Sequence, residues 1–193
     1  MIGFAFCASH CTFADSISVL KRFVCKYGDI CPIMSENAYT TDTRFGKAED
    51  IVCEIEEICG RRIIHTVKDA EPLGPATPLS ALVVCPCTGN TLAKCASGIT
   101  DTAPTMAIKA HLRVGRPTLI ALASNDAMSA NLANLSTLLN RKSIYFVPLL
   151  QDSPIGKPHS LVADFSKVEA AFDAMSRGEQ LRPLFLANAD RAI

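Results

Sequence analysis

The chain has 193 residues, of which 49% are hydrophobic, which is enough for one well-buried domain and too few to require two. Lysine plus arginine equals aspartate plus glutamate at 19 each, so the sequence shows no electrostatic footprint for nucleic acid or an anionic membrane surface. No apolar run approaches the roughly 18 residues that a membrane helix needs. We therefore predict a single domain over 1–178 with a C-terminal tail at 179–193, and a small molecule or a protein as its partner.

The nine cysteines all lie in the first half of the sequence, and their odd number in a chain of this size does not suggest a disulfide framework. Reduced thiols fit this pattern and favour a cytoplasmic protein. Cys85 and Cys87 lack the paired Cys-x-x-Cys spacing of zinc sites, so we predict no metal. Cys87 is a candidate reactive thiol if the following helix dipole lowers its pKa.

Strand and helix patterns alternate along the chain. Unalternating apolar runs predict strands at 2–6, 30–34, 62–67, 81–85, 118–123 and 144–149. Apolar residues at helical spacing predict helices from Ser9 to Gly28, from Asp42 to Gly60, at 91–97, at 102–114, around 128–139 and at 163–175. Prolines favour loops at 71–78 and 151–159. We predict that Ser9 and Asn90 cap helix N-termini, and that Gly98 ends a helix.

This alternation predicts a Rossmann-like, three-layer α/β sandwich of the flavoprotein type, with a parallel sheet of about six strands and right-handed crossovers. Ligands of such sheets bind at the carboxyl ends of the strands, where the strand order reverses. Four predicted strand ends carry small or polar residues, as a bound nucleotide would need. The residues that we expect to bind a cofactor there are Cys7, Ser9, Ser35, Pro86, Thr88, Asn90, Thr91, Ala123 and Ser124.

The segment 81–101 contains the main part of the predicted ligand site. A buried strand breaks at Pro86, and a short loop leads into a helix whose first turn has unpaired N–H groups and a positive dipole end. We interpret 86–91 as a phosphate cradle. The alternative is an ordinary strand-to-helix turn, because Thr, Gly and Asn also form plain turns. Asn125, at the end of the next strand, has a similar alternative as an N-cap.

Two segments resemble motifs of the homo-oligomeric flavin-containing Cys decarboxylase family. Pro86-Cys-Thr-Gly-Asn-Thr-Leu-Ala-Lys94 is similar to its Pro-x-Ser-x-Asn-Thr-x-Ala-Lys motif, with Thr88 in place of the serine. Ala121-Leu-Ala-Ser-Asn-Asp-Ala-Met128 resembles its Ala-Pro-Ala-Met-Asn-x-x-Met motif, in which Asn125 and Met128 match. The resemblance spans roughly residues 1 to 165 and implies FMN as a cofactor and a homo-oligomer.

The sequence departs from this family at two points. Cys7 and Ala8 stand where the family usually has Thr and Gly, which implies a less close approach of the backbone to a flavin. Pro72 occupies the position of the family's catalytic histidine, so the resemblance implies that decarboxylase chemistry is absent. A flavin-dependent decarboxylase of a cysteine-like carboxylate is therefore the alternative function.

Three stretches, at 40–49, 71–75 and 145–148, narrow the resemblance to a branch of B subunits that belong to a two-subunit synthase acting during sporulation. The branch implies an oxidoreductase that dehydrates and oxidises a hydroxylated tetrahydropyridine dicarboxylate to its aromatic product together with an A subunit. The hydride acceptor is FMN, or NADP held by the partner. A binding subunit that is not itself catalytic, and that completes the partner's active site, is a further alternative.

We select three candidate catalytic residues near the predicted crevice. Arg44 is expected to bind a substrate carboxylate, and His10 is a candidate general acid or base. Asn125 follows from the second family motif. The alternative for His10 is an ordinary exposed histidine at a turn.

Overall fold

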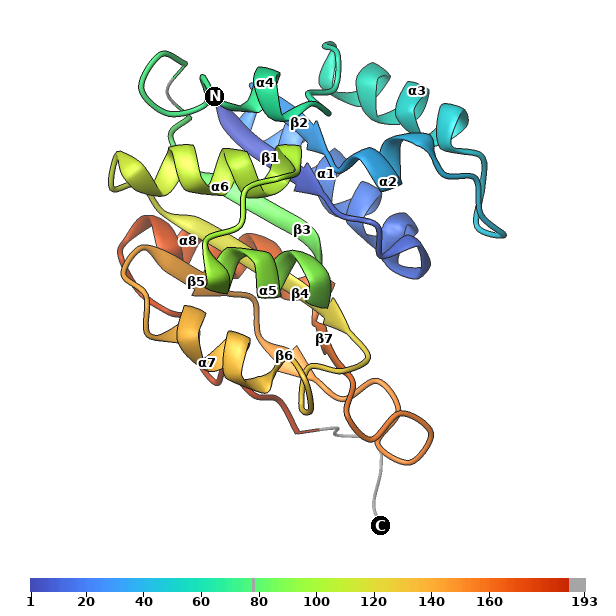
Figure 1. The fold of residues 1–193 in the computed structure, drawn as a ribbon, viewed down its shortest axis with the longest axis vertical. Coiled ribbons are helices and arrows are strands. Elements are labelled where there is room, and N and C mark those ends of the chain that lie inside the picture. Colours follow the sequence, from blue (N-terminus) through green and yellow to red (C-terminus); the bar gives the residue numbers. More distant parts are fainter. Residues whose placement is uncertain (78, 188–193) are drawn as a thin grey trace.

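The computed structural model describes residues 1–77 and 79–187. Within this range, one seven-stranded sheet lies between two layers of helices (Figure 1). The strands are β1 (Ile2–Phe6), β2 (Ile30–Met34), β3 (Leu82–Thr88), β4 (Thr118–Ser124), β5 (Ile144–Phe146), β6 (Leu149–Leu150) and β7 (Leu161–Ala163). The helices are η1 (His10–Thr12), α1 (Phe13–Tyr27), α2 (Glu36–Thr40), α3 (Ala48–Cys59), α4 (Val67–Ala70), α5 (Gly89–Ser97), α6 (Ala103–Arg113), α7 (Leu132–Leu139), η2 (Phe165–Lys167) and α8 (Val168–Ser176).

The strand order is β2-β1-β3-β4-β7-β6, and β5 pairs with the first half of β4. The pairs among β1 to β4 are all parallel, whereas β7 is antiparallel to both β4 and β6. All residues of β1 and β2 are buried, as expected for strands covered on both faces. The chain moves outward from β1 to β2 and then returns to the other side of β1, so the strand order reverses between β1 and β3. The predicted Rossmann-like sandwich is confirmed.

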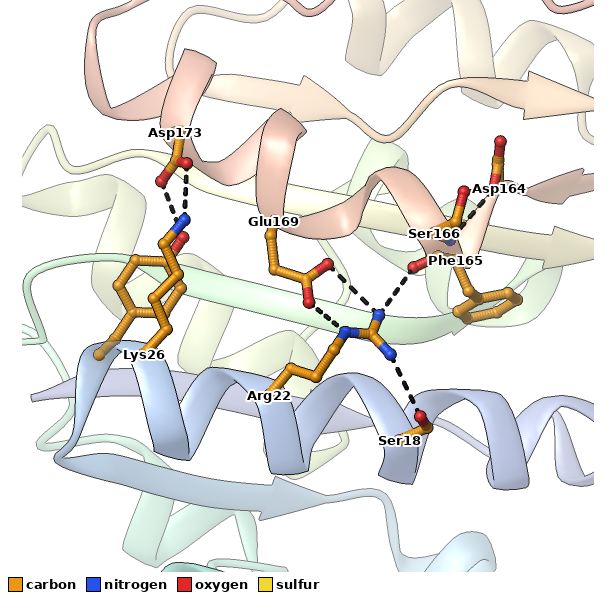
Figure 2. A network of polar contacts seen from close by, with 9 residues as sticks. Ser18, Arg22, Lys26, Asp164, Phe165, Ser166, Glu169 and Asp173 are labelled. Atoms are coloured by element: carbon orange, nitrogen blue, oxygen red, sulfur yellow. Dashed lines mark hydrogen bonds and ion pairs between the residues drawn. The ribbon is translucent and has the colours of Figure 1, made fainter.

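The two helical layers contain different sets of helices. α5 packs between α6 and α7 on one face of the sheet, and α1 packs against α3 and α8 on the other (Figure 1). Figure 2 shows the α1–α8 contact. Arg22 binds both carboxylate oxygens of Glu169 and the carbonyl oxygen of Phe165, while the Lys26 ammonium lies 2.8 Å from Asp173 Oδ2. These ion pairs fix the last helix to the first.

The structure corrects the predicted end of the fourth strand. β3 continues through Pro86 to Thr88, instead of breaking at the proline. Pro86 has no N–H to donate to the neighbouring strand, and the pairing between β3 and β4 shifts register between Val84 and Cys87. The strand therefore accommodates the proline at an irregularity.

Several other element predictions were wrong. The second helix begins at Ala48 rather than Asp42, because Asp42 Oδ1 accepts a hydrogen bond from the Ala48 N–H at 2.8 Å and residues 43–46 form a tight turn. The predicted strand at 62–67 is reduced to a single bridge between Ile64 and Ile33. Short α2 was missed.

The C-terminal half also divides into more helices and strands than its hydrophobic pattern predicts. The run at 144–149 divides into β5 and β6, and the predicted helix at 163–175 is β7, η2 and α8 in succession. Met128 lies in a turn before α7. Beyond α8, the Gln180 side chain pairs with the backbone of Phe146, and Leu149 hydrogen-bonds to Leu184 and Leu186. The segment after α8 therefore adds to the outer edge of the sheet.

Candidate functional site

The carboxyl ends of the four parallel strands meet at one edge of the sheet. The Cys7 N–H donates to the Pro86 carbonyl oxygen at 3.1 Å, and the Ser35 N–H donates to the Phe6 carbonyl oxygen at 3.0 Å. Thr88 is paired with Ala123. The structure therefore brings together the predicted cofactor-binding residues of all four strand ends.

The turn between β1 and α1 presents polar groups to this edge. The Thr12 N–H and hydroxyl both donate to the Ser9 carbonyl oxygen, at 3.0 and 2.9 Å, and the Thr12 hydroxyl also reaches Ser9 Oγ at 3.2 Å. Ser9 makes no side-chain cap, so the predicted N-cap is wrong, because η1 separates Ser9 from α1. Its hydroxyl accepts from Thr12 and lies 3.9 Å from Cys11 Sγ, with either atom of that pair able to donate.

His10 lies in the same turn, with its ring 5.0 Å from that of Phe13. Its Nδ1 atom is buried and has no hydrogen-bond partner among the described residues. Burial lowers the pKa of His10, which favours the neutral imidazole. A neutral histidine with an unsatisfied ring nitrogen can accept or relay a proton.

The turn between β3 and α5 is closed by Thr88. Thr88 Oγ1 accepts the Thr91 N–H at 3.2 Å and donates to Thr91 Oγ1 at 3.1 Å, so Thr88 is the N-cap of α5. The predicted cap, Asn90, is instead an exposed residue within the first turn. Gly98 ends the helix in the left-handed conformation, as predicted, with φ of 75°.

A polar cluster after β4 was missed by the sequence analysis. Asp126 accepts hydrogen bonds from the Ser124 hydroxyl and from Asn131 Nδ2, the latter at 2.9 Å, and Asn134 Nδ2 donates to Asn131 Oδ1 at 2.9 Å. The Ser124 hydrogen bond holds the pKa of Asp126 below its usual range. Asn125 is exposed and lies well before α7, so its alternative as an N-cap is wrong.

This cluster packs directly against the start of α5. A Cβ atom on Gly89 would lie 2.5 Å from Ser124 Oγ, 2.7 Å from Asn131 Nδ2 and 2.8 Å from Asp126 Oδ1. Only glycine fits at this position without displacing the cluster. The ionised carboxylate next to the first turn of α5 already supplies negative charge to that helix end. A phosphate is therefore disfavoured there.

Buried thiols lie beneath the edge. Cys7, Cys85, Cys87 and Cys95 are each 7% exposed or less. Burial raises the pKa of Cys85 and of Cys95 to about 12. The interaction between the Cys7 and Cys87 thiols raises the pKa of Cys87 and lowers that of Cys7, and Cys87 Sγ donates to the Thr88 carbonyl oxygen at 3.6 Å. The prediction of a reactive Cys87 was wrong, because this residue belongs to β3 rather than to an open loop.

The predicted cation lies outside this set of strand ends. Arg44 is exposed on the turn between α2 and α3, with its guanidinium 4.8 Å from the Phe45 ring centroid. Figure 1 shows this turn projecting beyond the carboxyl edge of the sheet. Lys94 pairs with both carboxylate oxygens of Asp101, at 2.8 and 2.9 Å.

Within residues 1–77 and 79–187, no group of three or more His, Cys, Asp or Glu side chains is arranged to hold a metal ion. Over the same residues, no helix has the length and hydrophobicity that crossing a membrane requires.

A sheet with this strand order and small or polar residues at its carboxyl edge is typical of nucleotide-binding α/β domains. Residues 29–173 match the Flavoprotein family, and the chain belongs to that family. It is 36% identical over 187 residues to the B subunit of dipicolinate synthase from Bacillus subtilis (strain 168), a match that covers 97% of this chain and 94% of the relative. This relative represents the branch that the sequence resembles, and the resemblance is confirmed.

Solved structures agree with this assignment. The dipicolinate synthase B subunit from Bacillus halodurans C has a TM-score of 0.88 and 36% identity, over 96% of this chain and 95% of that chain. The FMN-dependent cysteine decarboxylase SpaF has a TM-score of 0.66 and 22% identity, over 92% and 95% of the two chains. The second likeness shows a shared fold.

Proposed function

We propose that this chain is the FMN-binding B subunit of a dipicolinate synthase, acting in the cytoplasm as an oxidoreductase subunit during sporulation. The observation that carries the proposal is the 36% identity to the B subunit of a dipicolinate synthase over 97% of the chain. The meeting of four polar strand ends at the point of reversed strand order supports a nucleotide site.

The residues at the edge fit an FMN molecule. Ser9 contributes a hydroxyl on the β1–α1 turn, and that turn carries no acidic side chain between Cys7 and Thr12. Ser35 caps the first turn of α2 by accepting the Ala38 N–H at 3.4 Å. Because Asp126 disfavours an anion at α5, we place the phosphate at the β1–α1 turn and near Ser35. Bound FMN supplies a hydride acceptor.

The remaining predicted residues would hold the flavin ring and the substrate at the same edge. Pro86, Thr88, Asn90 and Thr91 approach from β3 and α5. Ala123, Ser124 and Asn125 approach from β4, where exposed Asn125 can donate and accept hydrogen bonds. Cys7 contributes from β1 as a buried thiol.

The proposed substrate is a hydroxylated tetrahydropyridine dicarboxylate. Its conversion to dipicolinate releases one water and transfers two electrons and two protons to an acceptor. His10, whose pKa is lowered by burial, is the proposed acceptor of a proton during loss of water. Arg44 binds a carboxylate. The acceptor is FMN on this chain, and NADP on the A subunit is the alternative.

Reconstitution with the A subunit tests the proposal. The purified complex should form dipicolinate from the hydroxylated substrate, and each subunit alone should not. His10→Gln should lower kcat in the complex while the complex still assembles and binds FMN. Undiminished turnover by the A subunit alone would contradict the proposal. Turnover that requires this chain but no flavin would instead support a non-catalytic subunit.

The decarboxylase alternative has little support in the structure. Pro72, at the position of the family's catalytic histidine, lies in the turn after α4 and carries no acid or base. We expect no release of carbon dioxide from cysteine-like carboxylates. We further propose a homo-oligomer, which size-exclusion chromatography with light scattering can test. We propose one domain over 1–178 and a tail at 179–193, of which Gln180, Leu184 and Leu186 pair with β5 and β6.

A further inference from the structure

A pocket of about 280 Å³ opens between the end of α5, one side of α6 and the turn after α7. The apolar part of its lining is Cys95, Ile99, Ile108 and Leu112, and the charged part is Lys109 and Arg141. Small glycine and threonine residues complete the wall, and its lining among the described residues contains no Asp or Glu. The pocket is therefore apolar inside and positively charged at its rim.

This pocket is separate from the candidate site at the carboxyl edge of the sheet. α5 is nine residues long, begins at that edge with Gly89 and is followed by Gly98, which belongs to the pocket. Because a helix rises 1.5 Å per residue, the pocket begins about 13 Å from the strand ends. Figure 1 shows α5 and α6 on the face of the sheet opposite α8. A ligand in this pocket would not compete with one at the strand ends.

Arg141 is fixed in the wall by a single hydrogen bond. Its Nη1 atom donates to the Cys95 carbonyl oxygen at 3.2 Å, at the end of α5. The carbonyl end of a helix carries about half a negative charge, which the full charge of the guanidinium exceeds. A guanidinium has five N–H donors in a planar fork, so one hydrogen bond to the helix leaves others for a ligand.

The two cations of the pocket have no counter-charge in the protein. Neither Lys109 nor Arg141 forms an ion pair with any described carboxylate. The carboxylate of Asp101, in the connection between α5 and α6, is held by the Lys94 ammonium at 2.8 and 2.9 Å. An exposed cation in water needs no partner, but two unpaired cations beside one apolar pocket favour a ligand with an apolar body and a negative group.

We propose that this pocket binds a small aromatic carboxylate, with its ring against Ile99 and Ile108 and its carboxylate on the Arg141 guanidinium. Lys109 supplies the second positive charge. The volume lies near the lower limit of roughly 300 Å³ for ligand pockets, which suits a body of one or two rings. Ile99 is 47% exposed in the free protein, so a ring that covers it also gains from burial of apolar surface. The proposal is independent of the proposed function.

Binding of naphthalene-2-carboxylate tests the proposal, and naphthalene-2-carboxamide is the uncharged probe of the same shape. The protein is treated with FMN beforehand, so that a flavin at the strand ends excludes the probes from that edge. Calorimetry compares the wild type with Arg141→Gln and Lys109→Gln. Arg113→Gln and Lys142→Gln are the matched controls, because both residues are exposed neighbours of the pocket that do not line it. Circular dichroism reports whether each variant is folded.

Methyl NMR of the isoleucine side chains reports where the probe binds. The methyl signals of Ile99 and Ile108 should shift on addition of naphthalene-2-carboxylate. The signal of Ile155, which is 94% exposed in the loop after β6, should not. Shifts confined to isoleucines outside the pocket would overturn the proposal.

Arg141→Gln should weaken binding of the carboxylate about ten-fold, as expected for the loss of one charged hydrogen bond, and leave the carboxamide unaffected. The glutamine amide can still donate to the Cys95 carbonyl oxygen, so α5 should keep its end. Lys109→Gln should weaken the carboxylate by a smaller factor, and both controls should retain the wild-type affinity. Equal affinity of the wild type for the two probes, or an unchanged affinity in Arg141→Gln, would overturn the proposal. A wild type that binds neither probe, as when a second copy of the chain covers the pocket, would also overturn it. Retention of FMN is measured separately and decides the proposed function alone.

Discussion

Gly89 lies beside Asp126, whose Oδ1 atom would be 2.8 Å from a Cβ atom at Gly89. The first residue of α5 therefore packs closely against the turn after β4. Because Asp126 also binds Ser124 and Asn131, one contact connects the two strand ends that form half of the candidate site. The negative charge at this point explains why we place a phosphate elsewhere.

Gly89→Ala should destabilise the protein and disturb the site. The new methyl group would lie less than 3.0 Å from three polar atoms, and overpacking of this kind costs about 1 to 3 kcal/mol. Urea unfolding measures the loss. Asn90→Ala, at the exposed neighbouring position, should change the free energy of unfolding by less than about 0.5 kcal/mol. Equal free energies of unfolding of the two variants would show that the cluster of Ser124, Asp126 and Asn131 can shift to admit the methyl group without loss of stability.

Arg22→Ala should loosen the attachment of α8 to α1. Arg22 binds both oxygens of Glu169, whose side chain is only 19% exposed, and also reaches Phe165 and Ser18 (Figure 2). We expect a loss of about 1 kcal/mol after allowance for screening by solvent. Lys21→Ala is the control, because its partner Glu54 is 44% exposed and the pair should contribute about 0.5 kcal/mol or less. An equal effect of both changes on chemical unfolding would contradict this ranking.

Fold and site differ in how far the sequence determines them. Long apolar runs such as 2–6 and 118–123 predicted their strands, because strands buried on both faces leave a continuous apolar signal. The two- and three-residue strands β6 and β7 exist only through pairing with each other and with β4, and so short a segment carries no period. The polar strand ends could also be predicted, because each of them directly follows a strand that a continuous apolar run marks.

The site residues that were missed depend on tertiary contacts. Asp126 appeared as an ordinary turn residue, and only the return of α7 brings Asn131 onto its carboxylate. Cys87 was misjudged because β3 continues through Pro86, which buries the thiol.

The stability of the protein should fall as the pH drops below about 6.5, owing to His111. Its Nε2 donates to the Pro117 carbonyl oxygen at 2.9 Å, and its buried Nδ1 has no partner among the described residues, so protonation would bury a positive charge and an unpaired N–H. Burial lowers the folded-state pKa of His111. The unfolded chain therefore binds the proton first, and stability is full above about pH 6.5 and decreases below it.

Urea unfolding across this pH range measures the slope. His111→Gln, which can keep the donor to Pro117, should reduce the slope at the expense of packing. His159→Gln, on the exposed 151–160 loop, should retain the wild-type slope. If His111→Gln leaves the pH dependence unchanged, another group causes it.

Cysteine labelling should show where the ligand binds. Cys11, Cys25 and Cys53 are exposed, whereas Cys7, Cys31, Cys85, Cys87 and Cys95 are buried. A thiol reagent should therefore modify the three exposed residues rapidly in the native protein, and mass spectrometry identifies them. FMN should protect Cys11, in the β1–α1 turn, but not Cys25 on α1 or Cys53 on α3. Protection of all three, or of none, would contradict the assigned site.

FMN binding tests the central claim most directly. The purified chain is incubated with excess FMN, passed through gel filtration, and its absorbance spectrum is recorded beside that of a Ser9→Ala, Ser35→Ala double variant. Our account predicts that the wild type retains the flavin band at close to one FMN per chain, and that the double variant loses most of it while remaining folded. A wild-type chain that emerges colourless would contradict the account.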